Sequence, residues 1–229
     1  MTHSHPPASA PPPGTRVGDQ PGDAEGAYTH RPYYWELYTE GSGTWRRRNT
    51  SPPGQDLAAL RRGMGRPPGS VPAMWQHYVH LGDGPTGSAA GDAPESSARG
   101  WARLVAEHHA LTLFGMHQQS QTRPMHHTGF GLGNAVRALA DSGRFSTEAV
   151  RRRFTAAATA GGVEELAHHL RGLISQLRSV DPPLALDYTR LVQDLTSWQF
   201  PDGQALVRRS WGRQYESRRS APAEPSGQR

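Results

Sequence analysis

The side chains best suited to chemistry in this chain are its arginines. All 25 basic residues are arginine, and the formal net charge is +5 at pH 7. Arginine holds phosphate groups bidentately and stacks on exposed bases. Several arginines are grouped in segments with helical patterns, at 61–62, 151–153 and 208–209. Their type and grouping favour binding to an anionic polymer such as nucleic acid.

Not all of these arginines can serve one ligand. Three consecutive residues on a helix sweep about 200° of its surface, so Arg151, Arg152 and Arg153 point in different directions. A charge run is usually a solvated face or a set of pairs within one helix, but near this triplet only Glu148 offers a carboxylate. Five aromatic residues offer stacking platforms, although core packing is the favoured role for each: Trp75, Tyr78, Trp198, Trp211 and Tyr215.

Other kinds of site are disfavoured. The chain has no cysteine, which excludes disulfides, thiolate metal sites and thiol nucleophiles. Adjacent histidines on a helix point about 100° apart, so the pairs 108–109 and 168–169 cannot chelate a metal as a unit, and no HExxH or GxSxG motif is present. We therefore expect no catalytic residues, no metal and no cofactor.

A glycine-rich segment, HTGFGLGNAV at 127–136, has the spacing of a phosphate loop only superficially. It has neither a preceding strand nor a following GK[ST], so nucleotide binding is disfavoured. The small residues favour close packing of the following helix against the neighbouring long helix at 98–119.

The composition separates foldable segments from segments too polar to fold. The apolar fraction is 34%, with 26 glycines and 20 prolines, against roughly 45% apolar residues in ordinary globular chains. Residues 1–27 and 218–229 are predicted to be disordered tails, and residues 83–97 a linker or surface loop. The N-terminus resembles no signal peptide and no segment is apolar enough to span a membrane, so we expect a cytoplasmic protein.

Helical periodicity accounts for the rest of the sequence. Apolar residues spaced alternately by three and four are clearest from Val163 to Leu177 and from Leu184 to Trp198. Ser146 is expected to cap the helix that carries the arginine triplet. No stretch alternates with a period of two. The expected fold is all-α, a bundle of about eight or nine helices in two lobes, residues 28–82 and 98–217. The other predicted helices cover 31–40, 55–62, 72–81, 98–119, 131–139 and 202–216.

Seven pieces of the sequence, in order, resemble the CasB family, the small subunit of the type I-E CRISPR surveillance complex Cascade. They are DLAALRRGMGRPPGSVPAMWQHYV, AEHHALTLFGMHQQS, GFGLGNAVRALADSGR, STEAVRRRF, ELAHHLRGLISQLR, LALDYTRLVQDLTSW and VRRSWGRQY. The resemblance runs from Asp56 to Tyr215. No single piece is diagnostic, but their order is collectively specific.

The resemblance implies a non-enzymatic, all-helical protein with an N-terminal and a C-terminal lobe. The implied partners are the backbone and large Cascade subunits, a second copy of this chain, the guide RNA and the target DNA, chiefly its displaced strand. Proteins of such complexes stabilise this strand through backbone contacts that carry no sequence information. By position in the matching pieces, the strand contacts are expected from Arg61, Arg62, Arg144, Arg151, Arg152, Arg153 and Arg171, and more loosely from Arg208, Arg209 and Arg213.

The chain departs from the family pattern in its N-terminal tail, in the linker and in the loop that carries Arg46, Arg47 and Arg48. Whether this loop adds a DNA contact is open at this point. Composition alone also allows a freestanding nucleic-acid-binding protein, or a structural adaptor whose arginines bind acidic protein surfaces.

Overall fold

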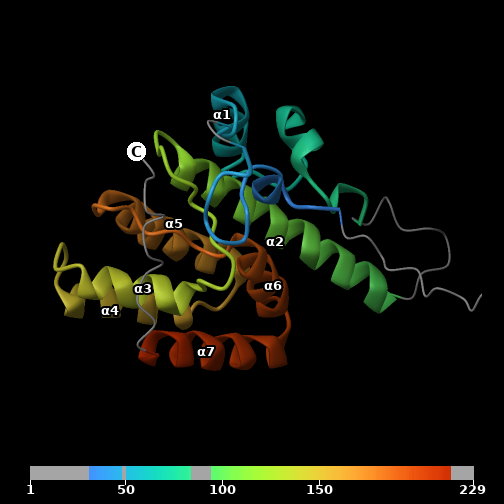
Figure 1. The fold of residues 1–229 in the computed structure, drawn as a ribbon. Helices are drawn as coiled ribbons and strands as arrows, with labels where there is room; N and C mark the ends of the chain where they lie inside the picture. The colour runs from blue at the N-terminus through green and yellow to red at the C-terminus, as the bar shows by residue number, and fades with distance from the viewer. Residues whose placement is uncertain (1–30, 48–49, 84–93, 218–229) are drawn as a thin grey trace, which may run out of the picture. The chain divides into compact units, whose positions relative to one another are not determined.

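The helices follow one another with few extended segments between them. The computed structural model describes residues 31–47, 50–83 and 94–217 (Figure 1). Within these ranges the chain forms seven α-helices and three short 3-10 helices, with isolated β-bridges in place of strands. The predicted all-α class is confirmed. The α-helices are α1 (Gly54–Arg62), α2 (Pro94–Gln118), α3 (Leu132–Asp141), α4 (Thr147–Ala158), α5 (Val163–Ser179), α6 (Tyr188–Trp198) and α7 (Pro201–Glu216), and the 3-10 helices are η1 (Tyr34–Leu37), η2 (Pro72–His77) and η3 (Leu81–Asp83).

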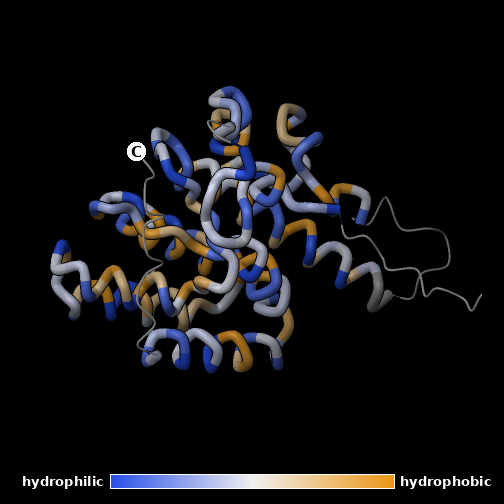
Figure 2. Tube along the Cα trace, in the orientation of Figure 1, coloured by the Kyte–Doolittle hydropathy of each residue, from blue (hydrophilic) through white to orange (hydrophobic). Residues whose placement is uncertain are grey.

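The long helix α2 contacts elements from both halves of the sequence. It packs against α1 and η3 from the N-terminal part and against α5 and α6 from the C-terminal part. Helix α3 in turn packs against α4, α5 and α7, and α6 also packs against α7. Figure 2 shows apolar and polar stretches alternating along the helices, as amphipathic helices require.

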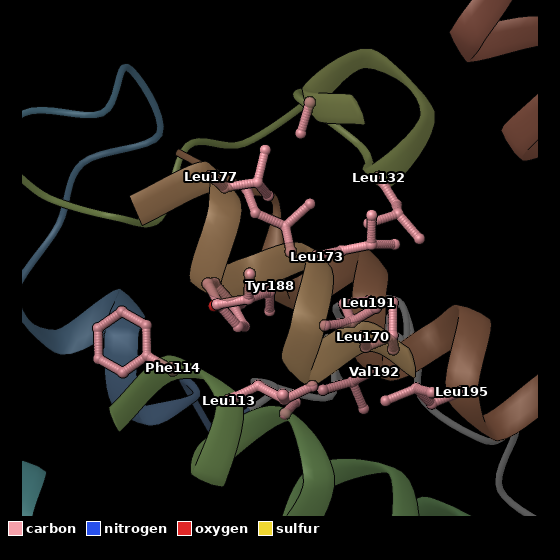
Figure 3. Packing of buried hydrophobic residues seen from close by; sticks show 14 of the residues in the cluster. Leu113, Phe114, Leu132, Leu170, Leu173, Leu177, Tyr188, Leu191, Val192 and Leu195 are labelled. Carbon is pink, nitrogen blue, oxygen red and sulfur yellow. The ribbon is translucent and has the colours of Figure 1, made fainter. Parts of the chain in front are cut away.

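The core forms where α2, α3, α5 and α6 meet (Figure 3). The leucine stripe predicted for α5 is buried there and contacts side chains of neighbouring helices. Burying such side chains is the main favourable term in the stability of a helical bundle. The residues labelled in the core are Leu113, Phe114, Leu132, Leu170, Leu173, Leu177, Tyr188, Leu191, Val192 and Leu195.

Three predicted helices differ in the structure. The segments 31–40 and 72–81 form only the 3-10 helices η1 and η2, with extended backbone after η2. The helix expected from Leu184 to Trp198 is α6, and it begins at Tyr188. Just before α6, Leu186 pairs with the segment 125–127. The N–H of Leu186 donates to the carbonyl oxygen of Met125, and the carbonyl oxygen of Leu186 accepts from the N–H of His127. These bonds hold the segment extended, so the helix starts only after Asp187, which caps it by accepting from Arg190 N–H at 2.9 Å.

The predicted tails at 1–27 and 218–229 lie outside the described residues, as does most of the predicted linker. Helix α2 begins at Pro94 and therefore takes in residues 94–97 of that linker. Proline suits the first turn of a helix, since its missing N–H has no partner there in any case. The division into two lobes stays a prediction.

Candidate nucleic-acid interface

The arginine triplet lies on the solvent face of α4. Ser146 caps this helix as predicted, with its hydroxyl accepting from Ala149 N–H at 3.2 Å. Val150 and Phe154 are buried on the opposite face. Packing of that face fixes the rotation of α4, so Arg151, Arg152 and Arg153 are all exposed.

Glu148 divides the triplet into two kinds of arginine. Its carboxylate accepts two hydrogen bonds from Arg151, both at 3.1 Å, and lies 3.8 Å from Arg152 Nη1. The Arg153 side chain has no hydrogen bond or ion pair within the described residues. Two of the three positive charges are thus partly compensated, and that of Arg153 remains available to a ligand.

Arg208 connects α7 to the end of α4. Its Nε donates to the carbonyl oxygen of Ala158 at 2.7 Å, and its Nη2 donates to Gln204 Oε1 at 3.2 Å. Its guanidinium lies 5.1 Å from the centre of the Trp198 ring. The bond to Ala158 satisfies an otherwise free carbonyl at a helix C-terminus, where a cation is also favoured. Arg208 therefore has a structural role alongside any contact with DNA.

The other predicted arginines lie in several places. Arg209 and Arg213 are exposed on α7, and Arg144 is exposed in the loop before α4. Arg62 is exposed at the end of α1, whereas Arg61 is half-buried there. Figure 1 shows α1 at the top of the view and α7 at the bottom. The arginines of α1 therefore lie in a different part of the molecule from those of α7, whose Arg208 bonds the end of α4.

Arg171, on α5, is also half-buried, and its Nε is buried without a hydrogen-bond partner in the described part of the chain. Its positive charge helps to lower the pKa of His109, although burial of that imidazole is the larger cause. In the arginine-rich loop, Arg46 Nε donates to the carbonyl oxygen of Glu36 at 2.7 Å. Arg48 lies outside the described residues.

Sequence reasoning did not single out Arg190. This residue lies in the first turn of α6 and is exposed, and its Nη2 donates to Ser210 Oγ of α7 at 2.8 Å. A lone arginine in the segment DYTRL carries no signal of a ligand. Only the packing of α6 on α7 brings it near Arg213.

The aromatic residues divide between the core and the surface. Trp198, Trp211 and Tyr78 are buried, in agreement with the core role favoured for them. Trp75 is 51% exposed, and its Nε1 donates to the carbonyl oxygen of Gly69 at 2.6 Å. Trp75 is therefore the best placed of the five to stack on a base.

The segment Glu107-His108-His109 is part of the packing between α2 and the N-terminal segment. Glu107 accepts hydrogen bonds from the backbone N–H groups of Val79 and His80, at 2.6 and 2.8 Å. His108 lies 2.6 Å from the Tyr78 hydroxyl and 3.1 Å from the carbonyl oxygen of Gly63. Among the described residues there is no group of three metal-ligating side chains. Glu107 and His108 thus find their hydrogen-bond partners inside the protein.

Burial of Glu107 contributes to the pH dependence of the free energy of unfolding. Desolvation raises its pKa to about 7, despite the two backbone N–H groups that lower it. The folded state therefore binds this proton more tightly than the unfolded chain does. The associated stability is fully present below the unfolded pKa and is lost as the pH rises through the folded pKa.

We accordingly expect Glu107→Gln to flatten the fall in the free energy of unfolding between about pH 4.5 and pH 7. Urea denaturation of both proteins across this range measures the difference. Burial lowers the pKa values of His108 and His126 to about 4, so both residues lower the stability of the fold as the pH falls. This effect is the same in the two proteins and cancels when their free energies of unfolding are compared. Parallel profiles for the two proteins would contradict the assignment to Glu107.

No helix within the described ranges is long and apolar enough to cross a membrane. No curated protein matches this chain significantly.

The chain is similar to one known protein family and to solved structures of CRISPR-associated proteins. The family model of CRISPR-associated protein Cse2 matches residues 56–215. The crystal structure of CasB from Thermobifida fusca is similar with a TM-score of 0.56 and 31% identity, over 72% of this chain and 85% of that one. A Cse2-family CRISPR-associated protein from Thermus thermophilus matches with a TM-score of 0.49 and 24% identity, over 70% and 85% of the two chains. The chain belongs to the Cse2 family of CRISPR-associated proteins, the family that includes CasB.

Proposed function

We propose that this chain is the small subunit of a type I-E Cascade complex in antiviral defence, and that it is not an enzyme. In the cytoplasm it would join the backbone and large subunits, a second copy of itself and the guide RNA. Its task is to hold the displaced strand of the target DNA through non-sequence-specific contacts. The observation that carries the proposal is the exposed run Arg151–Arg153, for which Glu148 is the only carboxylate partner among the described residues.

The mechanism is electrostatic. Pairing of guide RNA with the target strand exchanges one duplex for another of similar stability, so R-loop formation is nearly balanced. Arginines that neutralise phosphates of the displaced strand release its counterions and shift this balance toward the open state. The arginines of α4 and α7 act in this way, with those of α1, the 144 loop and α5 as further contacts.

Target-DNA affinity of the reconstituted guide-RNA complex, measured with and without this chain, tests the proposal. We expect the chain to raise affinity by about tenfold or more at 50 mM salt and by much less at 200 mM, because phosphate contacts weaken as salt increases. A matched non-complementary DNA controls for adsorption to the complex. Equal affinity with and without the chain at both salt concentrations would indicate a structural adaptor and overturn the proposal.

A further inference from the structure

A hollow of about 290 Å³ lies where the start of α3, the first turn of α6 and the last turns of α7 meet. We call it the α3–α6–α7 hollow. Arg190 and Arg213 line it together with polar side chains that include Ser210, Gln214 and Asn134. The described residues that form its wall include no acid. The hollow is thus a positively charged depression separate from the arginine row of α4.

Neither arginine forms an ion pair within the described part of the chain. The exposed side chain of Arg213 has no hydrogen-bond or ion-pair partner there, and the side chain of Arg190 bonds only the neutral Ser210. The nearby carboxylate of Asp187 accepts from the backbone N–H groups of Gly129 and Arg190, at 2.6 and 2.9 Å. Asp187 therefore caps α6 and does not pair with either guanidinium.

Ser210 has one hydrogen-bonding capacity left over. Its Oγ accepts from Arg190 Nη2 at 2.8 Å and from Gln214 Nε2 at 3.1 Å. A hydroxyl accepts two hydrogen bonds and donates one. Because both lone pairs are used, the Ser210 O–H is left to donate toward an acceptor in the hollow.

Close contact of α3 and α7 fixes this arrangement. Gly133 N–H donates to Gln214 Oε1 at 3.0 Å, and Asn134 Nδ2 donates to the carbonyl oxygen of Gln214 at 3.0 Å. A Cβ atom at Gly133 would collide with the carbonyl oxygen of Trp211. The glycine-rich segment therefore permits close packing as predicted, but against α7 instead of the long helix. The wall of the hollow is held in place before any ligand arrives.

We propose that the α3–α6–α7 hollow binds one phosphodiester group of a nucleic-acid strand. Arg190 and Arg213 approach its charged oxygens from two helices, and the Ser210 hydroxyl donates a further hydrogen bond. Arginine's planar fork matches phosphate oxygens, and the absence of acids among the described residues lining the hollow favours an anion. The inference rests on the proposed function and adds a contact on α6 and α7 to the row on α4.

The test uses the full-length chain and an oligothymidylate of about 15 nucleotides, long enough to span one binding module. One variant combines Arg190→Gln with Arg213→Gln. The matched control combines Arg66→Gln with Arg103→Gln, which removes the same charge from two exposed positions outside the hollow. We expect the first variant to lose about tenfold in affinity at low salt and the control less than about twofold, with the salt slope of the first reduced by about 0.7 for one lost phosphate.

A second measurement uses the same full-length chain labelled with ¹⁵N-arginine. We expect inorganic phosphate and the oligothymidylate each to shift the Nε signals of Arg190 and Arg213. Shifts with inorganic phosphate alone would reveal a site for the free ion and overturn the proposal, and so would equal affinity losses in the variant and its control. Failure of the proposed function is distinguished by the reconstituted complex, which would then bind target DNA equally well without this chain.

Discussion

Replacing Arg151, Arg152 and Arg153 with alanine is expected to lower the target-DNA affinity of the assembled complex by about ten- to a hundredfold at low salt. All three side chains are exposed, so those that face the strand can bind a phosphate without rearrangement of the core. The salt slope should fall by up to about 2, because each phosphate on a single strand contributes about 0.7. Affinity measurements at several salt concentrations give both quantities.

The three arginines should not contribute equally. Arg151 and Arg152 share Glu148, whereas Arg153 has no partner in the described part of the chain. Arg153→Ala alone is therefore expected to account for most of the loss. Glu148→Gln serves as the matched variant, because it frees the other two guanidiniums and should raise affinity by about two- to fivefold at low salt.

Circular dichroism of each variant checks that α4 remains helical, since the triplet is solvent-exposed and alanine favours a helix. Unchanged affinity in the triple variant with intact helicity would remove the triplet from the interface. Weaker binding in Glu148→Gln would show that the carboxylate acts otherwise than by competing with phosphate.

Periodicity was enough to predict those helices whose apolar face meets the core. The stripe from Val163 to Leu177 became α5, and the capping position of Ser146 was also correct. Both signals are local, because a helix repeats every 3.6 residues and a cap needs only its own first turn. Such features can be predicted without knowledge of the partner segments.

The segments where prediction was wrong are those whose structure depends on distant residues. Trp35 Nε1 donates to Thr189 Oγ1 at 3.0 Å, and Tyr34 lies edge-on to His77 with ring centres 4.7 Å apart. Each of these aromatic side chains is fixed by its own contact with a residue distant in the sequence. The surrounding backbone is therefore positioned without forming a complete α-helix. Sequence spacing contains no information about such contacts.

The site shows the same limit. Sequence reasoning found the exposed arginines of α4, yet it missed Arg190 and did not foresee that Arg208 bonds Ala158. The structural role of Arg208 and the grouping of Arg190 with Arg213 both depend on how α7 packs against other helices. A residue's type predicts what it can bind, but only the packing decides which residues act together.

Trp211→Ala is expected to lower the free energy of unfolding by about 3–5 kcal/mol, a large part of the stability of an ordinary domain. The Trp211 side chain is fully buried and stacks on Trp198, with ring centres 5.4 Å apart. Its Nε1 also donates to Asp194 Oδ2 at 2.7 Å. Alanine would remove the stacking, leave a cavity between α6 and α7, and deprive a buried carboxyl group of its donor.

Trp101→Ala provides the matched control, because the same side chain is lost from a position that is 41% exposed. Urea denaturation should show a smaller loss for this variant, about 1–2 kcal/mol, because a large part of its ring already faces solvent. Similar losses for the two variants would mean that the contact between α6 and α7 contributes little to stability.

Trp211→Phe separates the hydrogen bond from the packing, because phenylalanine keeps most of the buried ring but has no N–H. Desolvation already raises the pKa of Asp194 to about 6, and the bond from Trp211 lowers it in part. Without that donor the pKa rises further, so the penalty of ionising the buried carboxyl group grows. The destabilisation by Trp211→Phe should therefore be smaller near pH 5, where the carboxyl group stays protonated, than above pH 7. Adding Asp194→Asn removes the titrating group, and the effect of Trp211→Phe should then become independent of pH in this range.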